Sequence, residues 1–263
     1  MAKVILIQAQ PCARLDSREN LQRALALLAR CQGQKADVIC FPEYFPFFGD
    51  KELAQAALDL QAYIVAGLVE EDRGKLYNTA TLFDRRGVLA GRQRKVTLGD
   101  LERRAFSISP GKNWQIFETD FGRLGIPVCI DFWGQPEAVR QLAAQKVDLI
   151  INPAIFPILR GHWSVGALAR AFDYYLPVVG INCSTFVAEI SGRHYPHQGG
   201  GSFAIQPSVP ADEPDLRRIV RGWDSLQDWI ILQGGEAEEI FSVTLDLEGV
   251  RKWRPVIQER FGI

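Results

Sequence analysis

Apolar runs of strand length alternate with segments of helical periodicity along the first part of the chain. A short apolar run that stops at a turn residue is typical of a buried strand, whereas apolar positions at i, i+3, i+4 and i+7 predict a helix. Apolar residues from Leu21 to Leu28 follow the helical spacing, and Asp16 or Ser17 precedes them as a candidate N-cap. Strands are predicted at residues 3–9, 36–43 and 63–69, and a second helix at about residues 51–62.

The pattern changes in the middle of the chain. Residues 76–95 predict two antiparallel strands joined by a turn at 85–87, and residues 114–129 predict a short strand, a turn at Gly122 and a strand running into Cys129. Helices are then predicted at 136–145 and 163–175, each followed by a strand, at 147–154 and 177–182. Helices that alternate with strands in this way indicate an α/β fold with a mixed sheet system and helices outside.

Polar side chains gather where the predicted strands end. The residues at these carboxyl ends are Glu43, Cys129, Asn152 and Asn182. Ligand crevices form at this edge of open α/β sheets. The rule was framed for parallel sheets, and the sheets predicted here are only partly parallel.

Composition restricts the partners. The 263 residues are 47% hydrophobic, and 30 Lys and Arg balance 31 Asp and Glu, so no basic field favours nucleic acid or an anionic membrane. No linker interrupts the pattern, and we expect a single domain over residues 1–263. The apolar start of the chain is too short for a signal peptide or a membrane span, which predicts a cytoplasmic protein with a small-molecule partner.

Metal, nucleotide and serine-hydrolase signals are weak. Five cysteines lie scattered without CxxC spacing, which fits neither a disulfide framework nor a zinc site. The histidines of "HYPH" (194–197) lack a third ligand, and we expect a loop at a pocket rim there instead. "GGGS" (199–202) lacks the phosphate-loop frame, and no GxSxG motif is present. No metal and no cofactor are therefore expected.

Cys129 has two possible interpretations, an inert core residue that ends a strand or a nucleophile. A nucleophilic thiol needs a base and a group that holds the developing negative charge. None of the three histidines has a context that singles it out as the base, whereas Glu43 lies among apolar residues that can raise the pKa of a carboxyl. Lys95 can supply the positive charge. Taken singly, Cys129 is more often core, Lys95 surface and Glu43 loop, and spacing cannot join them.

The order of three motifs changes this balance. "FPEYF" (41–45), "RKVTLGDLERRAFSISPG" (94–111) and "GIPVCIDFWGQPE" (125–137) together resemble the nitrilase superfamily of carbon-nitrogen hydrolases, whose triad is Glu, Lys and Cys in that order. Later segments look similar over most of the chain. The resemblance implies an αββα sandwich that pairs with a second subunit, as a homodimer or a larger homo-oligomer.

The resemblance also implies roles for individual residues. By matching positions, Glu43 is the general base, Cys129 the nucleophile and Lys95 the group that stabilises the tetrahedral intermediate. The backbone N–H of Ile130 is the second oxyanion donor, and Glu102 matches an additional glutamate that positions substrate. Further candidates for oxyanion or substrate binding are Asp131, Trp133 and Asn152.

The implied reaction is hydrolysis of a small amide to an acid and ammonia or an amine, through a thioester on Cys129. Branches that act on nitriles typically read CWE, so "CID" (129–131) favours the amidase-like branches, which include ω-amidase-like and carbamoyl-cleaving enzymes. Hydrolysis of a carbamoyl compound or a nitrile by the same triad stays open. So do acyl transfer to an amine and a protein that binds a small molecule without turnover.

Two stretches depart from the family pattern. The spacer "FWGQ" separates Asp131 from Pro136 by four residues, where many members have two. Residues 207–239 replace a shorter turn and strand, and we expect this segment to be a lid, a pocket wall or a dimer contact.

Overall fold

Two β-sheets form the centre of the protein in the computed structural model, which describes residues 1–104, 106–155, 160–220 and 225–261. The first sheet has the order β15-β1-β2-β4-β5-β6, with β3 paired to β4. Its parallel pairs are β1 with β2, β2 with β4 and β3 with β4, and the other pairs are antiparallel. Its strands are β1 (Ala2–Gln8), β2 (Val38–Cys40), β3 (Pro46–Phe47), β4 (Tyr63–Asp72), β5 (Lys75–Phe83), β6 (Leu89–Arg94) and β15 (Glu239–Leu245).

The second sheet has the order β14-β13-β10-β9-β8-β7. Its centre is parallel, because β9 pairs in parallel with both β8 and β10, and its edges are antiparallel. A separate antiparallel pair is formed by β11 (Phe186–Ile190) and β12 (Arg193–His197). The strands of the second sheet are β7 (Ile116–Glu118), β8 (Arg123–Gly125), β9 (Leu149–Ala154), β10 (Val178–Asn182), β13 (Phe203–Ile205) and β14 (Ile230–Gln233).

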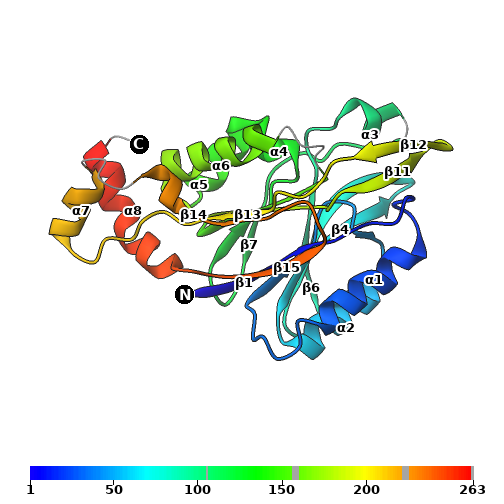
Figure 1. Cartoon of the computed structure of the whole chain (residues 1–263), viewed down its shortest axis with the longest axis horizontal. Helices are drawn as coiled ribbons and strands as arrows, with labels where there is room; N and C mark the ends of the chain where they lie inside the picture. Colours follow the sequence, from blue (N-terminus) through cyan, green and yellow to red (C-terminus); the bar gives the residue numbers. More distant parts are fainter. Residues whose placement is uncertain (105, 156–159, 221–224, 262–263) are drawn as a thin grey trace.

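Helices cover the outer faces of the two sheets, which gives the expected αββα order of layers (Figure 1). Helices α1 and α2 lie outside the first sheet, and α4, α5 and α6 lie outside the second. Ser17 caps α1 by accepting a hydrogen bond from the Glu19 N–H. The helices are α1 (Arg18–Ala29), α2 (Asp50–Leu60), α3 (Asp100–Arg104), α4 (Ile130–Trp133), α5 (Pro136–Ala144), α6 (Arg160–Tyr174), α7 (Glu213–Val220) and α8 (Leu247–Phe261), with a short 3-10 helix at Leu226–Trp229.

Strand β1 shows why its central residues, 4–7, are all apolar. Successive side chains of a strand point to opposite faces of the sheet. Val4 and Leu6 pack into the core that the two sheets share, whereas Ile5 and Ile7 pack into a second core with Leu28 of α1. A central strand buried on both faces therefore reads as one continuous apolar run.

The strand predicted to run into Cys129 is shorter than expected. Strand β8 ends at Gly125, four residues earlier, and the chain then leaves the sheet through Pro127, which has no N–H to donate to a strand pair. The "HYPH" stretch is also different, since it forms most of strand β12 and not a loop. The hairpin predicted over 76–95 is confirmed as β5 and β6.

The segment 207–239 contains α7 and β14, and its residues 221–224 lie outside the described part of the chain. Helix α7 lies beside α8 at the end of the molecule opposite the β11–β12 pair (Figure 1). This position separates α7 from the cavity described below.

Candidate active site

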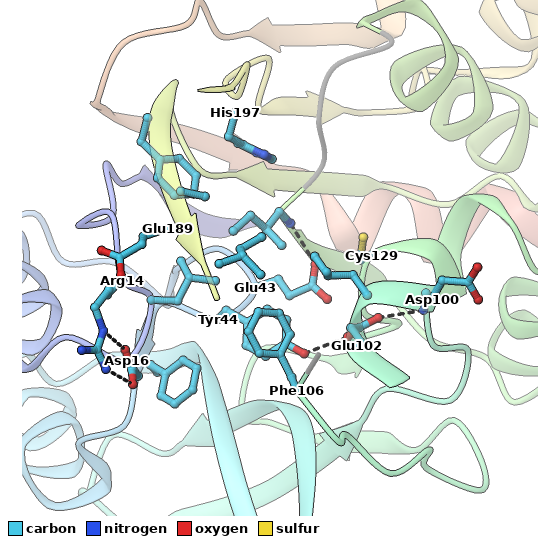
Figure 2. A pocket seen from close by; sticks show the side chains of 18 of the residues that line it. Arg14, Asp16, Glu43, Tyr44, Asp100, Glu102, Phe106, Cys129, Glu189 and His197 are labelled. Atoms are coloured by element: carbon cyan, nitrogen blue, oxygen red, sulfur yellow. Dashed lines mark hydrogen bonds and ion pairs between the residues drawn. The ribbon is translucent and has the colours of Figure 1, made fainter. Parts of the chain in front are cut away.

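A cavity of about 730 Å³ opens where the β11–β12 pair comes close to α3. It is lined by segments that are far apart in the sequence. The lining residues are 14–16, 43, 44, 47, 95, 99–102, 106, 129, 130, 133, 155, 186, 188–192 and 197. Glu43, Lys95, Glu102 and Cys129, which the sequence predicts as a catalytic group, all line this one cavity (Figure 2).

Glu43 is held in place by three donors. It follows β2 and is 1% exposed. Its Oε1 accepts hydrogen bonds from Lys95 Nζ at 2.8 Å and from Asn78 Nδ2 at 2.7 Å, and its Oε2 accepts one from the Ile155 N–H at 2.9 Å. A buried carboxylate with this many donors keeps a fixed orientation toward the cavity.

Lys95 joins two carboxylates. Its Nζ lies 2.8 Å from Glu43 Oε1 and 2.7 Å from Glu102 Oε2, and all three side chains are buried. Burial lowers the pKa of Lys95, but the nearby negative charges, Glu43 first, outweigh it and raise the pKa above its usual value. Burial by itself raises the pKa of the Glu102 carboxyl. The charge of Lys95 and the hydrogen bonds to the carboxylate outweigh this effect and hold the pKa below its usual value. The ammonium is therefore charged throughout the physiological range.

Cys129 occupies a strained backbone position immediately before α4. Its φ of 49° and ψ of −115° lie outside the common regions for a non-glycine residue, and its N–H donates to the Pro153 carbonyl at 2.8 Å. Burial and the negative charge of Glu43 raise the pKa of its thiol well above the usual range, against the opposing effect of Lys95. The resting side chain is thus a neutral thiol that needs a base to react.

The other predicted residues divide into two groups. Ile130 and Trp133 line the cavity next to Cys129, as expected for oxyanion or substrate contacts. Asp131 and Asn152 are fully buried and do not line it. Their polar atoms are engaged in hydrogen bonds inside the protein, with backbone groups and, for Asn152, also with the side chain of Trp163.

Asp131 accepts the N–H groups of Val96 at 2.9 Å and Thr97 at 2.7 Å. It thereby ties the turn of α4 to the segment that directly follows Lys95. The Asp131 carboxylate therefore holds the segment around Cys129 and the segment after Lys95 together.

Asn152 lies inside strand β9. Its Nδ2 donates to the carbonyls of Pro127 at 2.7 Å and Cys129 at 3.2 Å, and its Oδ1 accepts from Trp163 Nε1 at 2.7 Å. Asn152 therefore holds the backbone on both sides of Val128, at Pro127 and at Cys129.

Three features of the site were not predicted. Asn78 donates to both Glu43 and Glu102, and the Tyr44 hydroxyl donates to Glu102 Oε1 at 2.8 Å. The β11–β12 pair supplies a wall of the cavity, of which only a rim position for residues 194–197 was expected, and His197 of that stretch lines the cavity. Asn78 left a signal, since it is a polar residue within a strand whose later part is buried, but its partners lie 24 and 35 residues away.

Within the described part of the chain, no group of three or more His, Cys, Asp or Glu side chains is placed to hold a metal ion. Among the same residues, no helix has the length and apolar character needed to cross a membrane.

A thiol, a carboxylate and an ammonium in one buried cavity are suited to nucleophilic substitution at a carbonyl carbon.

Comparison with known proteins supports the same kind of chemistry. The family model described as carbon-nitrogen hydrolase matches residues 3–209. The chain is 27% identical to "Omega-amidase NIT2" of Xenopus tropicalis over 293 aligned positions, which cover 99% of this chain and 96% of that protein.

Two solved structures share the fold. Nit3 of Saccharomyces cerevisiae, a member of branch 10 of the nitrilase superfamily, superposes with a TM-score of 0.77 at 23% identity, covering 99% of this chain and 97% of that one. A variant of the amidase from Nesterenkonia sp. AN1, with the acetamide moiety of fluoroacetamide added covalently at its active-site cysteine, superposes with a TM-score of 0.73 at 20% identity, covering 100% and 97%. The αββα sandwich predicted from the sequence is confirmed.

Proposed function

The chain belongs to the carbon-nitrogen hydrolase family, and from that premise we propose that it hydrolyses a small amide to an acid and ammonia or an amine through a thioester on Cys129. One observation carries the proposal. The Lys95 ammonium bridges Glu43 and Glu102 in the cavity that also holds the buried thiol. A base, a nucleophile and a cation therefore face the same small space.

Acylation begins with the neutral thiol. Cys129 Sγ attacks the amide carbon while its proton passes to the Glu43 carboxylate, and the carbonyl oxygen becomes an oxyanion. Two of the three donors of Lys95 Nζ are engaged by Glu43 and Glu102. The third donor meets the oxyanion together with the N–H of Ile130. Glu43 then gives its proton to the leaving nitrogen, and the C–N bond breaks.

Deacylation repeats these steps with water. Glu43 takes a proton from a water molecule while the water oxygen attacks the thioester carbon. Lys95 and the N–H of Ile130 again donate hydrogen bonds to the oxyanion. The C–S bond then breaks, Glu43 returns the proton to Sγ, and the acid leaves. The residues end in the protonation states in which they began.

Glu102 positions the lysine in this account. Its Oε2 accepts from Lys95 Nζ and from the Gly99 N–H, and its Oε1 accepts from Tyr44 and Asn78. Four donors leave little freedom to this carboxylate, which keeps the ammonium next to Glu43 when the oxyanion forms. Glu102 also lines the cavity and can contact the substrate.

The relatives support an amide as the substrate. One is named an omega-amidase, and another is an amidase with an acetamide moiety on its active-site cysteine. The first name supports an amide as the substrate, and the adduct of the second shows that its active-site cysteine reacts as a nucleophile. Carbamoyl compounds and nitriles are the competing substrate classes for the same triad.

Two further proposals concern the whole protein. We propose that residues 1–263 form one domain that assembles as a homodimer or larger homo-oligomer, since α6 exposes Val165 (65%) and Phe172 (43%) on its outer side. We also propose a cytoplasmic location, which is supported by five cysteines that are all free.

A substrate panel tests the proposed reaction. The purified protein is incubated with primary amides, carbamoyl compounds and nitriles, and ammonia release is measured. We expect turnover with amides first, and a loss of about 10³-fold or more in kcat for Cys129→Ala. Cys12→Ala is the matched control, because Cys12 does not line the cavity. Equal activity in Cys129→Ala and the unmodified protein would refute the proposal.

A further inference from the structure

The cavity is much larger than a carboxamide group, and most of its wall beyond the reacting atoms is apolar. Its volume of about 730 Å³ has room for a substrate with a body of several carbon atoms. The large apolar side chains of this wall are Phe47, Phe106, Trp133, Ile155, Phe186 and Ile190. The part of the substrate that lies beside these side chains is therefore apolar.

The charged groups of the lining are mostly acidic. Among the described lining residues, five carboxylates face two cations, a formal excess of three negative charges. The carboxylates belong to Asp16, Glu43, Asp100, Glu102 and Glu189. In Figure 2, Asp16 and Glu189 lie on one side of the reacting group and Asp100 on the other, so the acidic character extends across the cavity.

Both cations of the described lining are already paired. Lys95 contacts Glu43 and Glu102, as above. Arg14 makes two hydrogen bonds with Asp16, from Nε to Oδ1 at 3.1 Å and from Nη2 to Oδ2 at 2.8 Å. His197 adds no charge near neutral pH, because burial lowers its pKa to about 4.

Glu189 is the acidic residue best placed to meet the far end of a substrate. It lies on β11 among the residues that line the cavity and is half-buried, and strand alternation points its side chain to the opposite face from Phe186 and Ile190. Its carboxylate lies near Arg14 (Figure 2), whose charge Asp16 already balances. A substrate long enough to pass Phe186 and Ile190 thus comes near a negative charge carried by the same strand.

From these observations we propose the substrate class of the reaction proposed above: an amide with an apolar body and an uncharged or cationic far end, with Glu189 as the residue that disfavours amides carrying a carboxylate. Repulsion from several carboxylates in a cavity of low polarity weakens anion binding. No described cation of the lining is left to offset it. An ammonium group at the same place meets Glu189 and is tolerated.

Three amides of similar length test this inference. They are heptanamide, aminohexanamide with its terminal ammonium, and the monoamide of hexanedioic acid with its terminal carboxylate. Ammonia release gives kcat/KM for each near neutral pH. We expect kcat/KM for the monoamide to be at least about tenfold below that of either other amide. A monoamide hydrolysed as well as the others, or better, would overturn the inference.

A pair of variants assigns the effect to Glu189. Glu189→Gln removes the charge with little change in shape, and it is expected to reduce the ratio of kcat/KM between aminohexanamide and the monoamide by about fivefold. Glu71→Gln is the matched control, since Glu71 is exposed on β4 outside the cavity, and it leaves the ratio unchanged. A ratio that does not fall in Glu189→Gln contradicts the assigned role.

The outcomes separate this inference from the proposed function. If amides are hydrolysed without regard to charge, the substrate class is wrong and the hydrolase stands. If no amide of either panel releases ammonia, the proposed function fails, and the substrate class fails with it.

Discussion

Glu43 has two opposite effects on the reactivity of the Cys129 thiol. In the proposed reaction the carboxylate takes the proton of the thiol, and its negative charge also raises the pKa of that thiol in the resting site. Lys95 opposes the second effect. A thiol with a raised pKa stays protonated in the resting site, which lowers its reactivity toward adventitious electrophiles.

Replacing Glu43 by Gln separates these two effects. Turnover is expected to be lost because the base is gone. The pKa of the Cys129 thiol is expected to fall, because burial remains but the negative charge that raised it is removed while Lys95 still lowers it. The pH midpoint of iodoacetamide labelling at Cys129, followed by mass spectrometry, should therefore move to lower pH in Glu43→Gln.

Cys12 provides the control within the same molecule. It is partly exposed, and Arg23 and Glu19 are the charged residues that affect its pKa, so its labelling midpoint should be the same in both proteins. A Cys129 midpoint that stays in place or moves to higher pH in Glu43→Gln would show that Glu43 does not act on the thiol as described.

The predicted catalytic residues came from the order of motifs, not from local pattern. The apolar context of Cys129, taken alone, favoured a core residue, and the structure shows that it is indeed 7% exposed. Burial and a reactive site coincide here. Asn78 was missed because its function depends on two carboxylates brought close only by the fold.

At the scale of elements, three pieces of secondary structure hold the nucleophile. Trp163 of α6 donates to Asn152 of β9, which donates to the Cys129 carbonyl directly before α4. A strained φ persists only where the surroundings fix it. This chain of hydrogen bonds is the structural support for the Cys129 backbone.

Trp163→Phe removes one donor from this chain and keeps an aromatic ring. The buried Asn152 Oδ1 loses its partner, which is expected to cost about 1–3 kcal/mol in the free energy of unfolding. Freedom at Asn152 should also lower kcat more than it changes KM. Chemical denaturation and steady-state kinetics measure the two effects.

Trp114→Phe is the control for this variant. Among the described residues, the buried Trp114 Nε1 has no hydrogen-bond partner, so its removal breaks no bond, and Trp114 lies outside the cavity. Its kcat should match the unmodified protein. An equal fall of kcat in both variants would mean that loss of core packing, and not the hydrogen bond to Asn152, is responsible.

Element boundaries were less predictable than element types. The hairpin of β5 and β6 was predicted because alternation and a turn at residues 85–87 are local signals. The end of β8 at Gly125 was not, because the apolar residues after it, such as Val128, are buried in the shared core without belonging to a strand. Strand β12 carries polar and exposed residues that do not resemble a buried strand.

At the scale of the molecule, the layers follow from periodicity. Central strands buried on both faces, such as β1, are continuous apolar runs, and the helices between them carry one apolar face. The sequence therefore predicts helices outside a sheet system. The pattern alone does not indicate how the strands are divided between two sheets. Pairing joins strands that are far apart in the sequence, such as β1 and β15 at opposite ends of the chain.

The proposed assembly gives a prediction at this scale. Val165→Glu places a charge on the exposed outer side of α6, and burial of that charge in a subunit interface is unfavourable. Light scattering after size-exclusion chromatography should show the unmodified protein as a dimer or larger and Val165→Glu as a smaller species. Leu58→Glu on α2 is the control, and a mass unchanged in all three proteins, or monomers throughout, contradicts the proposal.

The most direct measurement is the mass of the peptide that contains Cys129 during turnover of an amide. The reaction is stopped with acid at short times, and the protein is digested and analysed by mass spectrometry. We predict an increase equal to the amide minus ammonia on Cys129, which forms before the acid product and disappears as the substrate is consumed. Turnover with Cys129 unmodified at every time point, and undiminished in Cys129→Ala, would contradict the account.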